Sequence, residues 1–388
     1  MGELSLAILA KGFISPLLIE TLAEHKIPFL PQNKKVIEKL RSCAGNLNIL
    51  DEEEAIKLLL NRNTPIYTNA EDALPFLLKN SPDPSLVDNI RLFKNKLLMR
   101  LFLNKIYSDF YFLAVDKEEL KHIDLPAGGT YIIKPSIGFL SIGIRKIRTK
   151  EDLHSVIDEI FSETKKYSNT FPSSVINTDK FLIEEYIVGE EFACDAYFNS
   201  EGQAVILGIY SHPFLNEDDF RDVVYYTSSS IMHEMLPKVE EFFHSIASFK
   251  KIINFPVHIE FRLRKNMLVP IEVNPMRFGG FGLANLPYYA FGINSYEHYF
   301  LGKKPDWDKI LEKRKDEIFT FVLGRVPEKL SGDKKPDHEK FKGTFKDLID
   351  YYELDYKKYP AFAIAFGKTD DLSEALKYLG FDFDEYFY

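Results

Sequence analysis

Short apolar runs alternate with amphipathic stretches along residues 1–85. The runs predict strands and the stretches predict helices, in the order 4–9 (strand), 16–24 (helix), 27–30 (strand), 51–60 (helix), 66–67 (strand) and 71–78 (helix). Asp51 precedes three glutamates, which is typical of a helix N-cap followed by an acidic first turn. Strands that alternate with helices favour a parallel sheet, so we expect a small parallel α/β domain. The glycine fingerprint of dinucleotide-binding folds is missing from this domain, and we assign it no cofactor.

The turn-rich segment 80–85, Asn-Ser-Pro-Asp-Pro-Ser, predicts the end of this domain. Strands are then predicted at 131–134, 144–147, 180–187, 191–198, 204–211, 257–263, 267–273, 317–324 and 362–366, and helices at 87–105, 151–166, 236–249 and 373–379. These elements indicate a chain of several domains with mixed α/β and α+β structure. We expect four parts, at 1–85, 86–190, 191–305 and 306–388.

Composition narrows the class of protein. Of 388 residues, 45% are hydrophobic and 14% aromatic, which allows large cores. The formal net charge of −9 argues against a broad nucleic-acid-binding face. Cys43 and Cys194 are too few for a disulfide scaffold or a cysteine-built zinc site. The N-terminus does not read as a signal peptide, and no apolar run approaches the roughly 18 residues of a membrane helix. We therefore expect a cytoplasmic protein with neither a membrane nor a nucleic-acid partner.

Side chains with oxygen atoms cluster on the predicted hairpin at 257–273 and just after it. Glu272 and Asn274 are two residues apart on one strand, so both leave the same face, and Glu260 lies on the neighbouring strand. Oxygen donors without sulfur or clustered histidine suit Mg²⁺ that is held partly by substrate phosphates. Arg277 can bind a phosphate or carboxylate through two hydrogen bonds. The alternative is a solvated strand face that ends in a glycine turn.

A lysine followed by small residues ends the strand predicted at 131–134. Lys134 and Ser136 begin the segment Lys-Pro-Ser-Ile-Gly, and Ser141 with another glycine follows. The lysine charge and the backbone N–H groups of such a loop can hold a phosphate. The loop is not a Walker P-loop, because isoleucine and arginine stand where that motif has lysine and serine or threonine. An ordinary hairpin is the alternative.

An apolar strand runs into an acidic connector with the pattern E-x-Y-I-x-G-x-E, from Glu184 to Glu191. Such a connector suits a purine nucleoside. Backbone groups can read the base edge, Tyr186 and Ile187 can enclose the base, and Glu191 can accept from ribose hydroxyls. The alternative is an acidic turn between two strands.

In this order and at these spacings, the three segments resemble an ATP-grasp enzyme of the carboxylate–amine ligase type. The resemblance covers roughly residues 90–300, and a preceding α/β domain and a C-terminal extension are also typical of the superfamily. It implies two α+β subdomains that clasp ATP after the N-terminal domain. The small subdomain would be 86–190 with its linker helix, the large subdomain with the metal site 191–305, and the extension 306–388 would pack on them.

The resemblance also implies roles for single residues. ATP would be bound by Lys96, Lys134, Ser136, Ser141, Glu184, Tyr186, Ile187 and Glu191. Of these, Lys96 and Lys134 would contact phosphates, Glu184 with the 186–187 backbone would form the adenine hinge, and Glu191 would bind ribose. Glu260, Glu272 and Asn274 would bind Mg²⁺, with Mn²⁺ as the alternative. Arg277 and Lys134 would be the catalytic residues. Many members have Asn-Pro-Arg, whereas Met276 separates Pro275 from Arg277 in this sequence.

The reaction implied is ATP-dependent activation of a carboxylate as an acyl phosphate, followed by attack of an amine. The products are ADP, phosphate and an amide, and the commonest substrates are amino acids or short peptides. The loop 136–143 is the natural lid over such a site. The acceptor could instead be a thiol or another group. The protein could also be a non-catalytic ATP sensor or scaffold. A homodimer is possible.

Two histidines near these segments are more simply explained by solvent exposure or a structural role than by ligand binding. His212 follows the strand at 204–211, and a loop histidine is usually only solvated. His258 lies on the predicted hairpin, where a histidine on an apolar strand is more often structural. The alternatives are that His212 reaches a phosphate and that His258 shares the strand face of Glu260.

Overall fold

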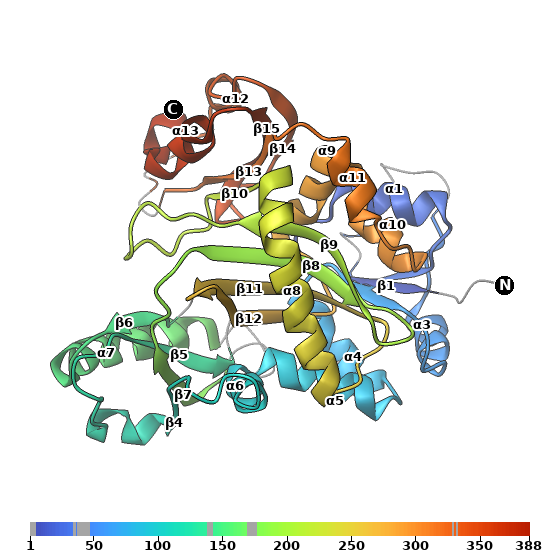
Figure 1. The fold of residues 1–388 in the computed structure, drawn as a ribbon. Helices are drawn as coiled ribbons and strands as arrows, with labels where there is room; N and C mark the ends of the chain where they lie inside the picture. Colours follow the sequence, from blue (N-terminus) through green and yellow to red (C-terminus); the bar gives the residue numbers. More distant parts are fainter. Residues whose placement is uncertain are drawn as a thin grey trace.

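Three sheets organise the chain in the computed structural model, which describes residues 5–33, 36, 47–137, 143–168, 177–327, 330 and 333–388. A three-stranded sheet belongs to the N-terminal domain, a four-stranded sheet to the following subdomain, and an eight-stranded sheet to the rest of the described chain. Figure 1 shows the large sheet in the centre, with the small sheet and the N-terminal domain on different sides of it. None of the described helices has both the length and the apolarity of a membrane span.

The N-terminal domain has a parallel sheet in the order β2-β1-β3, as the alternation predicts. Its elements are β1 (Leu6–Leu9), α1 (Pro16–Glu24), β2 (Phe29–Pro31), α3 (Glu52–Leu59), β3 (Ile66–Thr68), η1 (Glu71–Ala73) and α4 (Leu74–Asn80). All four residues of β1 are buried, as in a central parallel strand that is covered on both faces. Asp51 caps α3 in a reciprocal capping box with Glu54.

The single helix predicted at 87–105 is wrong, because two helices occupy this segment. They are α5 (Pro84–Lys94) and α6 (Lys96–Leu103). Asn95 lies between them in an extended conformation, and its side chain accepts hydrogen bonds from the N–H groups of Leu97 and Leu98. Asparagine competes for backbone donors in this way and so favours N-caps over helix interiors. The break makes Lys96 the first residue of α6.

The small sheet has the order β4-β7-β5-β6 and a helix on one face. Its elements are β4 (Phe112–Asp116), η2 (Lys117–His122), β5 (Tyr131–Ile137), β6 (Arg145–Ile147), α7 (Lys150–Ser168) and β7 (Asn177–Glu185). Ile133 and Ile183 pack into the core that includes Leu153 and Ile157 of α7. Because side chains alternate along a strand, the next residues, Lys134 and Glu184, face the other way.

The large sheet has the order β12-β11-β8-β9-β10-β13-β15-β14. Its strands are β8 (Glu191–Phe198), β9 (Ala204–Ser211), β10 (Val224–Thr227), β11 (Phe255–Arg264), β12 (Met267–Pro275), β13 (Ile318–Arg325), β14 (Leu348–Glu353) and β15 (Ala361–Thr369). The expected C-terminal extension supplies β13, β14 and β15, so it continues the sheet that carries the predicted metal residues. Two strands of this sheet were not predicted, the short β10 and the partly buried edge strand β14.

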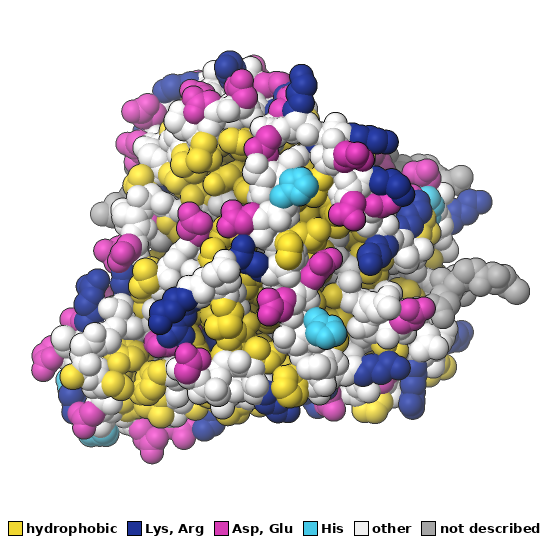
Figure 2. Space-filling model, viewed as in Figure 1, with side chains coloured by type: hydrophobic (Ala, Val, Ile, Leu, Met, Phe, Trp, Pro, Cys, Tyr) yellow, Lys and Arg dark blue, Asp and Glu magenta, His cyan; other side chains and the backbone are white. Residues whose placement is uncertain are grey.

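Helices flank the large sheet, and α8 crosses one of its faces in Figure 1. They are α8 (Ser229–Phe249), η3 (Gly280–Asn285), α9 (Leu286–Phe291), α10 (Ser295–Phe300), α11 (Trp307–Glu312), α12 (His338–Lys342), α13 (Leu372–Leu376), η4 (Lys377–Gly380) and η5 (Phe383–Tyr386). On the face seen in Figure 2, Lys and Arg side chains are interspersed with Asp and Glu.

Candidate active site

Two pockets meet at the hairpin of β11 and β12. The first encloses about 750 Å³, partly open to solvent, between the small and large sheets. The second encloses about 1480 Å³ and is bounded by loops of the N-terminal domain, by η3 and by the C-terminal strands. Asp222, Glu260 and Glu272 line both pockets, so these carboxylates form a shared wall.

The register of the hairpin brings the predicted metal residues together. Glu260 lies directly opposite Glu272, and His258 lies opposite Asn274. Burial and the charge of Glu272 raise the pKa of Glu260 well above its usual range. Burial also acts to raise the pKa of Glu272, but Lys96 outweighs it and lowers that pKa. The Nζ atom of Lys96 is 2.5 Å from an Oε atom of Glu272.

Lys134 and Glu184 form a buried charge cluster with Arg100. Arg100 donates to Glu184 through Nε at 3.1 Å and to the Pro270 carbonyl at 3.2 Å. Lys134 forms an ion pair with the other oxygen of Glu184. Burial lowers the pKa of Lys134, whereas the pKa of Glu184 is lowered by the two cations against the effect of burial. Arg100 was missed because it lies far from the motif, although it is one helical turn after Lys96.

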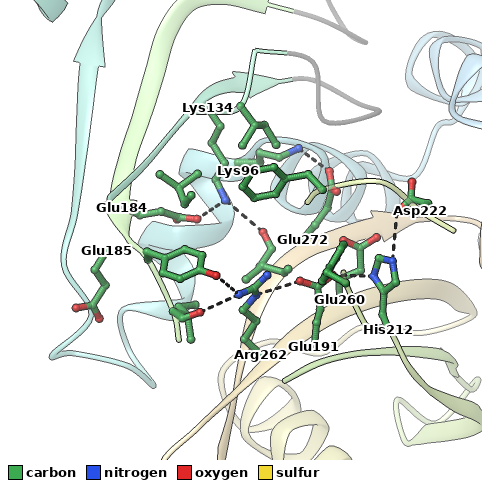
Figure 3. A pocket seen from close by; sticks show the side chains of 17 residues that line it. Lys96, Lys134, Glu184, Glu185, Glu191, His212, Asp222, Glu260, Arg262 and Glu272 are labelled. Carbon is green, nitrogen blue, oxygen red and sulfur yellow. Dashed lines mark hydrogen bonds and ion pairs between the residues drawn. The ribbon is translucent and has the colours of Figure 1, made fainter. Parts of the chain in front are cut away.

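The connector after β7 is held by an arginine on β11. Arg262 donates to the Glu191 carboxylate at 3.0 Å, the Tyr186 hydroxyl at 2.8 Å and the Ile187 carbonyl at 3.2 Å (Figure 3). Gly189 has a φ of +150°, and a Cβ there would stand 2.0 Å from the Leu263 carbonyl oxygen. Glu191, the predicted ribose ligand, thus pairs with Arg262, and the sequence pattern did not indicate this pair.

His212 is not the solvated loop residue that the sequence predicts. Its backbone N–H donates to the Glu191 carbonyl at 2.9 Å, which continues the pairing of the sheet beyond β9. Its ring is buried, contacts the Glu191 carboxylate at 2.9 Å and stacks on Tyr225 with centroids 3.9 Å apart. His258 is also buried and contacts Asp195 at 2.8 Å. Pairing with distant carboxylates explains both burials.

Met276, the residue that departs from the family pattern, makes the turn that leads to Arg277. It has a φ of +66°, its N–H donates to Pro256, and its carbonyl accepts from the Thr68 N–H at 2.7 Å. Arg277 then lines the second pocket and contacts Glu71 at 3.3 Å. Burial acts to raise the pKa of Glu71, but Lys94 and Arg277 lower it to about 2.

The structure collects most of the predicted site residues at the two pockets. The first is lined by Lys96, Lys134, Glu184, Tyr186, Ile187 and Glu191, the second by Asn274 and Arg277, and both by Glu260 and Glu272. Ser136 is buried on β5 and lines neither. Ser141, with most of the expected lid at 136–143, lies outside the described residues. Among the described residues, no three His, Cys, Asp or Glu side chains form a metal-binding group. The predicted metal set contains only two carboxylates, and an asparagine is its third member.

Part of the chain matches a family model and a curated protein. Residues 128–285 match the family model of the ATP-grasp domain. A segment of 94 residues is 31% identical to the D-alanine–D-alanine ligase of Phocaeicola vulgatus and covers 24% of each chain. The chain thus spans about a quarter of the length of this curated relative.

Solved structures resemble the chain over nearly its whole length. The L-amino acid ligase of Bacillus licheniformis has a TM-score of 0.67 and 17% identity, with 99% of this chain and 98% of that chain covered. The N5-carboxyaminoimidazole synthetase of Staphylococcus aureus, complexed with ADP, has a TM-score of 0.62 and 13% identity over 96% and 95%. The biotin carboxylase domain of the Hydrogenobacter thermophilus 2-oxoglutarate carboxylase, complexed with MgADP, has a TM-score of 0.62 and 16% identity over 96% and 89%. At these identities the likeness shows the fold.

Proposed function

Because residues 128–285 form an ATP-grasp domain within a chain of that fold, we propose that the protein is an ATP-dependent carboxylate–amine ligase. The shared wall of the two pockets carries this proposal. A pocket with two lysines and an apolar lining meets a second, larger pocket at paired carboxylates. Such a site can hold a nucleotide and an acceptor on opposite sides of one reaction centre.

The first pocket has the features of a nucleotide site. Isoleucines 132, 144, 187 and 271, with Phe214 and Phe220, give it apolar surfaces for a base. Arg262 holds the Tyr186–Ile187 connector that would read the base edge. Lys96 contacts Glu272 of the shared wall, and Lys134 lies beside it between Glu184 and the Ile271 carbonyl (Figure 3). The phosphates would be placed near these two lysines.

Glu260, Glu272 and Asn274 are the residues that would hold Mg²⁺. Their chemistry fits the ion, because two facing carboxylates and an amide offer oxygen ligands. When bound, Mg²⁺ would neutralise charge on the phosphates. Lys96 contacts Glu272 in the protein alone, and we expect it to turn to a phosphate when nucleotide and metal bind.

The second pocket would bring the substrate carboxylate to the γ-phosphate. A carboxylate oxygen forms a bond to phosphorus as the bond to ADP breaks, giving an acyl phosphate. The amine nitrogen then bonds to the acyl carbon, phosphate leaves and the amine loses a proton. Lys96, Lys134 and Arg277 would stabilise the charge of the transferring group, and no protein nucleophile is required.

The test is release of ADP and phosphate from Mg-ATP with pooled amino acids, against a control without substrate. A ligase releases both only with a pool, and mass spectrometry then detects an amide. Splitting the pool identifies the two substrates. Binding of ATP without release of ADP, after wider screening of carboxylates and amines, would contradict the proposal and favour an ATP sensor.

A further inference from the structure

The C-terminal strand β13 places an arginine in the second pocket. Phe321, Leu323 and Arg325 line this pocket, and because they are two residues apart they lie on one face of the strand. The intervening Val322 packs into the core on the opposite face. A strand outside the segment that matches the ATP-grasp domain thus supplies part of the proposed acceptor site.

Arg325 differs from the other arginines of the two pockets. Arg262 contacts Glu191, and Arg277 contacts Glu71. Among the described residues, the Arg325 side chain has neither a hydrogen bond nor an ion pair, although it is half-buried. Its guanidinium can therefore pair with an anion bound in the pocket without first giving up a partner among the described residues.

Aromatic side chains line the second pocket together with Arg325. Tyr225 on β10 is the register partner of Phe321 on β13, and their rings are 6.0 Å apart. Phe281 and Tyr359 line the same pocket with centroids 6.0 Å apart. These four aromatic side chains give the pocket surfaces that a hydrophobic group of a ligand can contact.

We propose that Arg325 binds a carboxylate of the amine substrate, which is an amino acid or short peptide with a hydrophobic side chain. This inference rests on the proposed function. The substrate carboxylate that is phosphorylated must lie at the shared wall, near Glu272 and Arg277. The anion at Arg325 is a second carboxylate that does not react, so the product amide keeps a free carboxylate.

Lys11 is the other cation of the second pocket without an ion pair among the described residues, but it fits this role less well. Its side chain is exposed on a loop of the N-terminal domain, and its charge acts on Asp72, which lines the same pocket. A guanidinium also matches the geometry of a carboxylate better than an ammonium does. We therefore expect Lys11 to contribute less.

The experiment compares wild type with Arg325→Met, Lys11→Met and Arg314→Met, the last an exposed arginine outside both pockets. The probes are phenylalanine and glycylphenylalanine, each paired with its C-terminal amide, and the two lengths distinguish amino acid from peptide. Calorimetry with Mg-ADP present gives Kd, and ADP release gives KM and kcat. Arg325→Met should raise Kd and KM for the acids by ~10- to 100-fold, with values for the amides and for ATP within about twofold.

Several outcomes would overturn the inference. They are equal weakening of acids and amides, unchanged binding of the acids, a larger loss in Lys11→Met than in Arg325→Met, or no binding of any probe by wild type. Binding of the acids that depends on Arg325, without ADP release from any acid and amine pair, would instead contradict the proposed function and leave the carboxylate site standing. Arg314→Met should behave as wild type, and unfolding curves confirm that each variant is folded.

Discussion

The two pockets share a carboxylate wall but differ in how their cations are held. In the first pocket, Lys96, Lys134 and Arg262 each contact a carboxylate of the protein. In the second, Arg277 contacts Glu71, whereas Arg325 has no such contact among the described residues. Charge balance on the nucleotide side is thus part of the folded protein, and a ligand must exchange partners there. In the second pocket, Arg325 and the more exposed Lys11 have no ion pair among the described residues, so their charges can meet a ligand directly.

The largest expected effect is on stability, from removing the anion of the buried cluster. Glu184→Gln leaves Arg100 and Lys134 buried without their carboxylate, and we expect the free energy of unfolding to fall by about 3–5 kcal/mol. Chemical denaturation measures this change. Asp116→Asn is the matched control on the same sheet, because its pair with Lys180 is about half exposed and should contribute less than about 1 kcal/mol.

Chemical denaturation of Arg325→Met tests whether the cations of the two pockets differ in their contribution to stability. That variant should unfold within about 0.5 kcal/mol of wild type, since none of the described residues forms an ion pair or hydrogen bond with the Arg325 guanidinium. A loss as large as that of Glu184→Gln would show that Arg325 has a structural role.

The next effect is on turnover at the shared wall. Glu272→Gln should lower ADP release by about 100- to 1,000-fold, because it removes charge where the metal and the transferring phosphate would lie. Steady-state kinetics measure this loss, and circular dichroism checks that the fold is intact. The control is Glu201→Gln in the exposed loop between β8 and β9, which should keep wild-type activity. Retained ATP-dependent activity in Glu272→Gln would contradict the metal assignment.

The pair of Glu71 with Arg277 and Lys94 predicts a pH dependence. Because the folded-state pKa is about 2, below the ordinary value of 4.5, this carboxylate stabilises the fold at pH above about 4.5. The contribution, on the order of 3 kcal/mol, is lost as the pH falls from about 4.5 to about 2. Denaturation of wild type and Glu71→Gln over this window measures it.

The wild-type curve should be the steeper of the two, because the variant cannot bind the proton. Glu201→Gln should follow wild type, since its side chain is exposed. Parallel curves for wild type and Glu71→Gln would rule out the contribution of Glu71.

The smallest effect is expected at the connector of the first pocket. Arg262→Lys keeps the charge but loses the planar group that contacts Tyr186, Ile187 and Glu191 together. We expect KM for ATP to rise by about tenfold, with kcat and the KM for the amine substrate nearly unchanged. An equal change in the KM of the amine would show that the two pockets are not independent.

Patterns of nearby residues were sufficient to predict many helices and strands and to recognise the site motifs in their order. Runs rich in apolar and β-forming residues predicted β8 and β9 with their observed bounds, and the capping residue Asp51 placed α3. The spacing of Glu272 and Asn274 predicted their shared strand face. These features depend on residues that are close in the sequence, where side-chain direction follows directly from backbone period.

Predictions were wrong at Asn95, where a local cap residue breaks a helix, and at His212, whose partners lie far away in the sequence. Asn95 is a residue type that favours N-caps, so the helix break at this position could have been predicted from the sequence. His212 carried no such signal, because its burial depends on Glu191 and Tyr225, which come from other strands. The strand β14 lies at the edge of its sheet, where Asp350 and Glu353 interrupt its apolar residues and its burial is only partial.

The sequence thus established most of the strands and the types of chemical group at the site, since these follow from residues near one another along the chain. The packing of the sheets decided which cation meets which carboxylate. Arg100 reaches Glu184 from a separate helix, Glu71 reaches Arg277 from the N-terminal domain, and Arg325 enters the second pocket from the C-terminal strands. Pairings of this kind join segments that are distant in the chain, so no periodicity in the sequence records them.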